Sequence, residues 1–272
     1  MRSFLKNILW RYKNLGTQIT DYGTKLKLAS FMDHLIFKEI FIDKIYDNYI
    51  KYSLNRDLEN NSPKRIIDIG GNLGFFTIRC CEIWNQIQTD KQLHFIIYEP
   101  SENCIKRLEK NLQGFDSNIF SFDIRNKLIG KKDGWDWFIE DCEHHLGQCV
   151  SQKIDRSGNR YSRRIAYENI TADLQLSKID LLKCDIEGSE VEFLKNFSSS
   201  FDGVHSIIIE THGQKAKDFV LKKMQETGFY IIQRVESKEE IVYSNLFFVN
   251  GRDEPLLSTK NDGEKEKNNR LL

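Results

Sequence analysis

The sequence has no excess of charge of either sign and no long apolar segment. Lysine plus arginine and aspartate plus glutamate each number 40, so the formal net charge is zero. Proteins that bind nucleic acids usually carry a basic excess, so we expect no nucleic-acid partner. No apolar run approaches the length of a membrane-spanning helix, and residues 1–15 lack the apolar stretch of a secretory signal.

The chain also lacks a C-x-x-C pair, although it contains six cysteines. Without such a pair, no zinc site is expected. Four cysteines lie in apolar or helical segments and are interpreted as buried thiols: Cys80, Cys81, Cys104 and Cys184. Free thiols suggest a reducing compartment, so we expect a cytoplasmic protein.

The dinucleotide-binding fingerprint G-x-G-x-x-G is missing as well, because Asn72 lies two residues after Gly70. In its place, the short β-branched run at residues 66–69 predicts a strand buried on both faces. A glycine-rich turn and a helix that begins near Gly74 follow it. Without a Cβ, the residues Gly70, Gly71 and Gly74 would let the backbone approach a ligand closely. A tight turn that holds no ligand is the alternative.

The acids that end two predicted strands indicate which ligand this turn would hold. Asp68 would repel the phosphates of a dinucleotide, so it favours a cationic or hydroxyl-rich ligand. S-adenosylmethionine fits, because it has a sulfonium, an ammonium and a ribose diol but no phosphate. The next predicted strand, residues 93–98, ends at Glu99, where a doubly wound sheet has the acid that binds a ribose diol. The alternative is that Glu99 is a surface acid.

A third segment, residues 179–190, again leads from an apolar strand into charged residues and a glycine. Lys183, Asp185 and Glu187 alternate, so they share one side of an extended chain. Open α/β sheets bind ligands where parallel strands end, and we expect these three side chains at that edge. A solvated turn with a Lys–Glu pair is the alternative.

Together these segments resemble the FkbM-type methyltransferases, a family of S-adenosylmethionine-dependent enzymes. The resemblance covers roughly residues 38–250 and rests on residues 68–74, 98–100 and 179–190, with weaker matches at 126–130, 171–174 and 209–212. It implies an α/β fold with a Rossmann-like class I methyltransferase sheet, in which seven mostly parallel strands end in a C-terminal antiparallel hairpin. It also implies S-adenosylmethionine as the cofactor and O-methylation of a hydroxyl on a sugar, glycan or secondary metabolite.

The resemblance assigns residues to the cofactor. Asn126, within the region of the third predicted strand, is favoured over Asp123 as the residue that faces the adenine. The whole set of expected cofactor-binding residues is Asp68, Gly70, Gly71, Asn72, Gly74, Phe75, Glu99, Pro100, Asn126 and Asp185.

We expect the chain to have three parts. Residues 1–55 would form a helical N-terminal extension whose first helix is basic and amphipathic. Residues 56–250 would form the methyltransferase domain. Residues 251–272 are charged and poor in apolar side chains, so we expect a disordered tail.

Residues 131–170 interrupt the alternation of strands and helices within the domain. Residues 135–139 alternate like a strand, and residues 161–169 could pair with them. Such an insertion near a cofactor site is interpreted as a cover for the methyl acceptor. His144 and His145 lie in it and are candidate bases.

Methyl transfer to an alcohol needs alignment of oxygen, methyl and sulfur, and a base that takes the proton. The catalytic candidates are His212, Asp185 and Lys183; His212 follows the fifth predicted strand, residues 206–210, and its ordinary pKa lies near neutrality. Asp185, Glu187 and Glu210 are of the type that binds a divalent metal. Their spacing matches no recognised metal loop, so no metal is assigned.

Two other functions stay open beside the methyltransferase acting on a small-molecule or glycan hydroxyl. One is a non-catalytic binding module on the same fold, which the intact set of Asp68, glycines and Glu99 argues against. The other is a nicotinamide-dependent oxidoreductase, which Asn72 and the expected terminal hairpin argue against. The oligomeric state does not follow from the sequence.

Overall fold

A seven-stranded sheet forms the centre of the computed structural model, which describes residues 15–59, 62–87, 89–141, 149–151, 160–175, 178–236 and 243–252. The strand order is β11-β12-β10-β9-β3-β4-β5. The strands are β3 (Lys64–Ile69), β4 (Leu93–Tyr98), β5 (Phe120–Arg125), β9 (Leu181–Cys184), β10 (Ser206–His212), β11 (Phe229–Glu236) and β12 (Tyr243–Asn250).

The pairing confirms the expected methyltransferase sheet. β3, β4, β5, β9 and β10 form parallel pairs with their neighbours. β12 runs antiparallel to both β10 and β11, which makes the terminal hairpin. The central strand β3 alternates Ile66 and Ile67 between the two faces of the sheet, and both side chains are buried. A parallel strand covered on both faces needs this apolar composition.

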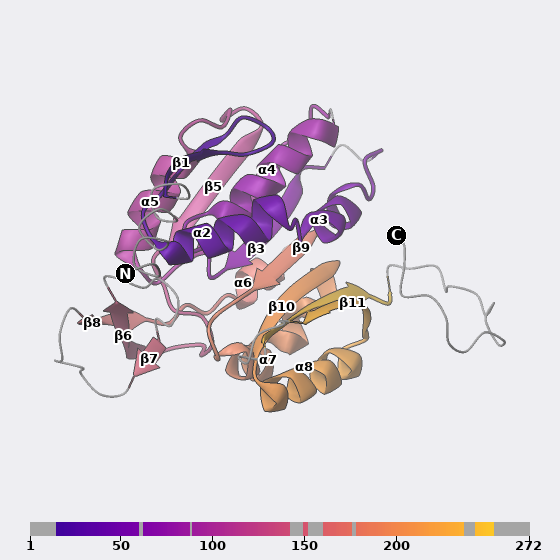
Figure 1. Cartoon of the computed structure of the whole chain (residues 1–272). Helices are drawn as coiled ribbons and strands as arrows, with labels where there is room; N and C mark the ends of the chain where they lie inside the picture. Colours follow the sequence, from indigo (N-terminus) through magenta and orange to yellow (C-terminus); the bar gives the residue numbers. More distant parts are fainter. Residues whose placement is uncertain are drawn as a thin grey trace.

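Helices cover both faces of the sheet (Figure 1). One apolar cluster joins Ile66 and Phe247 of the sheet to α4 (Phe75–Ile87), α5 (Glu102–Leu112) and the N-terminal helices. A second cluster joins the opposite face to α7 (Glu190–Phe197) and α8 (Gln214–Glu226). The short helix α6 (Thr171–Leu174) and the 3₁₀ helix η2 (Ser198–Gly203) also belong to this second side.

The N-terminal extension is only partly helical. α2 (Phe31–Phe37), the π-helical turn η1 (Lys38–Ile42) and α3 (Asp47–Leu54) agree with the expectation. The expectation was wrong for residues 16–28, which form an antiparallel hairpin of β1 (Gly16–Ile19) and β2 (Lys25–Leu28). The physical reason is the alternation in β2, which buries its two leucines and exposes its two lysines. The first expected helix lies outside the described residues.

The insertion forms a separate three-stranded sheet of β6 (Trp135–Asp141), β7 (Cys149–Ser151) and β8 (Arg160–Ala166). β6 pairs with β8 from Trp135 opposite Ala166 to Asp141 opposite Arg160, which confirms the expected pairing. His144, His145 and residues 253–272 lie outside the described residues. No helix in the described part of the chain is both long and apolar enough to cross a membrane.

Candidate active site

The glycine-rich turn after β3 is packed tightly against the ends of β4 and β9. The amides of Gly70 and Gly71 donate to the carbonyl of Tyr98, at 2.9 and 3.1 Å. A Cβ on Gly70, which has φ +86°, would lie 1.8 Å from the carbonyl oxygen of Asp185. A Cβ on Gly71 would lie 2.4 Å from Ile97. Close packing between strand ends therefore requires these glycines, and their expected approach to a ligand stays a prediction.

The rest of the turn is held by α5. A Cβ on Gly74, with φ +77°, would lie 3.0 Å from Leu108. Asn72 has φ +46°, and its side-chain oxygen lies 3.6 Å from the sulfur of Cys104. Phe75 lies in the core against the rings of Phe37 and Phe41, with 2 % of its surface exposed. Phe75 therefore supports the N-terminal helices, and the structure does not place it at an open pocket.

Glu99 lies at the end of β4 and connects the turn to the start of α5. Its two carboxylate oxygens accept from the amides of Asn72 and Ser101, each at 2.7 Å. The side chain is buried, and this burial raises the pKa of Glu99 to about 7. Each carboxylate oxygen has further acceptor capacity, so Glu99 can also bind the hydroxyls of a ribose.

Asn126 and Pro100 lie beside Glu99, and both are used to hold the loop after β4. The Asn126 amide donates to the carbonyls of Glu99 and Pro100, at 2.9 and 2.8 Å. Arg163 of β8 donates to the side-chain oxygen of Asn126 at 3.1 Å and also contacts the Pro100 carbonyl and Glu102. The insertion is thus fastened to the expected cofactor loop by one arginine.

Lys183 joins the ends of β3 and β9. Its ammonium lies 3.5 Å from Asp68, 3.3 Å from Asp185 and 3.3 Å from the Gly70 carbonyl. Asp68 is completely buried and accepts from the Thr77 hydroxyl at 2.9 Å, so its carboxylate faces these partners and not an open pocket. Burial alone would lower the pKa of Lys183, but Asp185, Asp68 and Glu210 outweigh it and raise that pKa. These contacts favour the charged ammonium of Lys183.

His212 is the last residue of β10 and is surrounded by carboxylates. Its Nδ1 lies 2.9 Å from Glu190, and its Nε2 lies 3.4 Å from both Glu187 and Glu210. Burial would lower the pKa of His212, but hydrogen bonds to Glu190 and Glu210 and the charge of Glu187 raise it to about 11. In the empty site these contacts favour the protonated ring, and the expected role of His212 as a base stays a prediction.

Two of the acids beside His212, Glu187 and Glu210, have raised pKa values, as does the more distant Glu39. Burial, followed by the nearby charge of Asp185, raises the pKa of Glu187 to about 7 and also raises that of Glu210. In the N-terminal turn η1, burial and the charge of Glu210 raise the pKa of Glu39 to about 8. At the edge where β9 and β10 end, carboxyl groups thus outnumber the two basic side chains, Lys183 and His212.

Three contributors to this edge were missed from the sequence. Glu190 was assigned only to a helix, and Glu39 and Asn245 were not considered for the site at all. The signal for Glu190 was its place at the start of α7, directly after the charged turn. Asn245 pairs with Glu210 in the β10–β12 ladder and accepts from the Tyr46 hydroxyl at 3.2 Å. No local pattern reveals that contact, because the two residues are far apart in the sequence.

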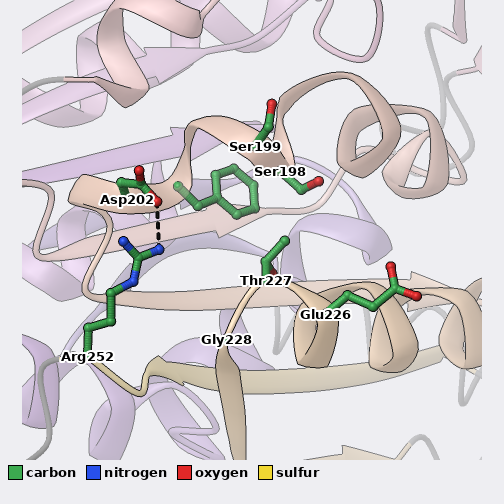
Figure 2. A pocket seen from close by; sticks show the side chains of 8 residues that line it. Ser198, Ser199, Asp202, Glu226, Thr227, Gly228 and Arg252 are labelled. Atoms are coloured by element: carbon green, nitrogen blue, oxygen red, sulfur yellow. Dashed lines mark hydrogen bonds and ion pairs between the residues drawn. The ribbon is translucent and has the colours of Figure 1, made fainter.

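A hollow of about 380 Å³ lies elsewhere, between η2, the turn from α8 to β11 and the residues after β12 (Figure 2). Arg252 and Asp202 form an ion pair of 2.6 Å across it. It is at the end where β10 begins, whereas the polar residues described above lie where the parallel strands end. Ligands of open α/β sheets bind at the latter end, so we do not assign the hollow to the active site.

The sequence profile of the methyltransferase FkbM domain matches residues 68–231, a stretch that contains the turn, Glu99 and the whole charged edge. The chain belongs to the FkbM methyltransferase family. A curated relative, methyltransferase sdnD of Sordaria araneosa, is 26 % identical over 211 residues, which cover 65 % of this chain and 73 % of that protein. S-adenosylmethionine is thus the methyl donor of this FkbM protein, and the buried Glu99 with its free acceptor capacity suits the ribose of that cofactor.

Solved methyltransferases have a similar overall arrangement. Magnesium protoporphyrin IX methyltransferase from Synechocystis PCC 6803, with bound S-adenosylhomocysteine, is 12 % identical with a TM-score of 0.47 and covers 89 % of this chain and 92 % of its own. TrmK of M. capricolum, in complex with S-adenosylhomocysteine, is 12 % identical with a TM-score of 0.41 and covers 74 % and 67 %. These likenesses say nothing about the acceptor.

Proposed function

We propose that this FkbM methyltransferase transfers the methyl group of S-adenosylmethionine to a hydroxyl of a sugar, glycan or other small metabolite. The sulfur–methyl bond breaks as the oxygen–methyl bond forms, and the products are S-adenosylhomocysteine, the methyl ether and a proton. The observation that carries the proposal is the position of two polar groups on either side of the glycine turn. Glu99 lies on the β4 side, and the Asp185, Glu187, Glu210 and His212 cluster lies on the β9–β10 side.

Each side has a distinct task in this proposal. Glu99 accepts hydrogen bonds from the ribose diol, and the turn from Gly70 to Gly74 passes beneath the cofactor. The charged edge orients the acceptor hydroxyl and receives its proton. Lys183 keeps the ends of β3 and β9 in register and neutralises Asp185, so it is a positioning residue and not the base. A hydroxyl-rich acceptor suits an edge composed of carboxylates and an imidazole.

Calorimetric titration with S-adenosylhomocysteine and, separately, with NADH tests the cofactor part. We expect binding of S-adenosylhomocysteine alone, and Glu99→Ala should weaken it by about 1–3 kcal/mol, because hydrogen bonds to a charged group are lost. Glu109→Ala, an exposed acid on α5, is the matched control and should leave the dissociation constant unchanged. Binding of NADH alone would make the protein an oxidoreductase instead.

Incubation with methyl-labelled cofactor and a panel of hydroxyl compounds tests the acceptor part. We expect the label in an ether product of at least one polyhydroxylated compound. Label on nitrogen or carbon acceptors only would overturn the assignment to oxygen. Cofactor binding without turnover on a broad panel would favour the non-catalytic module.

The raised pKa of Glu99 predicts that cofactor affinity depends on pH. Since the ionised carboxylate is the stronger acceptor, binding of S-adenosylhomocysteine should weaken as the pH falls below about 7, by up to roughly tenfold per pH unit. Without the cofactor, the raised pKa of Glu99 affects the free energy of unfolding with the opposite pH dependence. That free energy falls as the pH rises from the ordinary pKa of glutamate to about 7. Titrations of the wild type and Glu99→Gln at several pH values check this, and an equal pH dependence in both would contradict it.

A further inference from the structure

The charged edge contains three side chains that converge on one point. One ligand-type atom each of Asp185, Glu187 and His212 lies within 4.8 Å of the other two. They come from the ends of two neighbouring strands, β9 and β10, and Glu187 is turned toward the others by a backbone with φ +50°. Ligand atoms on one ion lie about 3–4.3 Å apart, so the three side chains would draw closer together on binding it.

The orientation of His212 is that of a metal ligand. Its Nδ1 is held by Oε1 of Glu190, whose side chain is completely buried and also accepts from the Gly188 amide at 2.9 Å. This leaves Nε2 directed at Glu187 and Glu210, at 3.4 Å from each. Metal-binding histidines almost always donate from the other ring nitrogen to a carboxylate, a backbone carbonyl or a water.

Two buried polar groups on residues that adjoin this cluster, Asn245 and Glu190, provide a second observation. Asn245 is 1 % exposed, and its side-chain nitrogen has no hydrogen-bond partner among the described residues. It is directly opposite Glu210 in the β10–β12 ladder, and opposite residues project from the same face of a sheet. The second carboxylate oxygen of Glu190, next to His212, is likewise buried and without a partner in the described part of the chain. A water or an ion bound beside these two groups would satisfy them.

We propose that Asp185, Glu187 and His212 bind one divalent cation, with Glu190 as the orienting carboxylate of His212 and Asn245 donating to a water on the ion. An imidazole with two carboxylates favours a first-row ion such as Mn²⁺ or Zn²⁺ over Mg²⁺ or Ca²⁺, which prefer oxygen ligands alone. The inference rests on the proposed function for its role. The ion would hold the acceptor hydroxyl and make its proton easier to lose, while Glu210 stays free to receive that proton.

Binding of Mn²⁺ to the metal-stripped full-length chain, measured by electron paramagnetic resonance without cofactor, tests the site directly. We expect one ion per chain and electron spin-echo modulation from a coordinated imidazole nitrogen. His212→Gln should abolish that modulation. Asp185→Asn and Glu187→Gln should each weaken binding at least tenfold, and Glu190→Gln should weaken it by about 10–100-fold.

The matched control is Glu192→Gln, an exposed acid on α7 that lies outside the cluster. It should bind Mn²⁺ like the wild type. Circular dichroism and thermal melting verify that every variant is folded. The proposal is overturned if the folded wild type binds neither Mn²⁺ nor Zn²⁺ saturably, or if Glu192→Gln is as impaired as Glu187→Gln.

The two proposals can fail separately. Saturable Mn²⁺ binding without binding of S-adenosylhomocysteine would retain the cation site and remove the proposed function. Binding of S-adenosylhomocysteine without any metal binding would do the reverse.

Discussion

Lys183 shows how one buried side chain organises separate parts of the active site. Its ammonium contacts a carboxylate from β3, a carboxylate after β9 and a backbone carbonyl of the glycine turn. Taking a charge out of water is costly, and the cost is offset only while the opposite charges remain in place. The site therefore depends on Lys183 to hold its carboxylates in position.

We predict that Lys183→Met lowers the free energy of unfolding by about 3–5 kcal/mol, because Asp68 is left buried and unpaired. Adding Asp68→Asn in the same chain should recover part of that loss. Denaturant unfolding of the two variants measures both effects. Lys195→Met, at an exposed lysine on α7, should change stability by less than about 0.5 kcal/mol. A double variant no more stable than the single one would contradict the pairing.

The kinds of residue at the site could be predicted from the sequence, but the contacts between them could not. Lys183 and Asp185 were expected at a strand end because an apolar run stops there. That Lys183 pairs with Asp68 depends on β3 and β9 being adjacent, and no local pattern indicates it. The burial of Asp68 and the carboxylates around His212 could not be predicted for the same reason, since both are properties of the folded chain.

The strand–turn–helix element from β3 to α4 is built around contacts that exclude a side chain at Gly70. We predict that Gly70→Ala destabilises the protein by about 3 kcal/mol or more, because both the positive φ and the collision with Asp185 oppose it. Gly114→Ala is the control, since its Cβ would have no neighbour within 4 Å. It should be neutral or slightly stabilising. Thermal melting distinguishes the two, and equal melting temperatures would refute the packing argument.

The three-stranded insertion reaches the cofactor loop through Arg163. We predict that Arg163→Ala raises the dissociation constant of S-adenosylhomocysteine several-fold, because Asn126 and the Pro100 carbonyl lose the contact that fixes the loop. Arg164→Ala, at the adjacent arginine that stacks on Trp135, serves as the control. Calorimetry measures both. Equal affinities in wild type and Arg163→Ala would show that the loop is held without the insertion.

Strands could be predicted from the sequence where the spacing of the apolar residues fits a strand and not a helix. The three apolar strands β3, β4 and β9 and the pairing of β6 with β8 were found because each run is apolar or alternates over several residues. The hairpin of β1 and β2 was missed because each strand has only four residues, too few to separate strand from helix periodicity.

At the scale of the whole molecule, two apolar clusters on opposite faces of one sheet make the described chain a single cooperative unit. S-adenosylhomocysteine at 100 times its dissociation constant should then stabilise the entire fold by about 2.7 kcal/mol. This corresponds to roughly 5–10 °C in Tm, and NADH should produce no shift. Differential scanning calorimetry checks this, and a shift in only part of the transition would contradict a single unit.

The sheet class was predicted through resemblance to a family and not from periodicity. Alternation of strands and helices indicates a parallel sheet, but it does not specify that β9 lies between β3 and β10. After β5 the chain crosses back so that β9 lies beside β3, and this crossover sets the strand order. The insertion lies within the crossover, so no local sequence pattern reveals it.

This strand order has a consequence for the chain as it leaves the ribosome. β3, β4 and β5 can pair as soon as they emerge, but the open edge of β3 must wait for β9, more than fifty residues later. Until then an apolar, unpaired strand is exposed, which is the situation that invites aggregation. During synthesis, the part of the sheet that emerges first therefore contains Asp68 and Glu99 but neither Lys183 nor the charged edge. The ligand-binding and charged halves of the site come together only when β9 and β10 have been added.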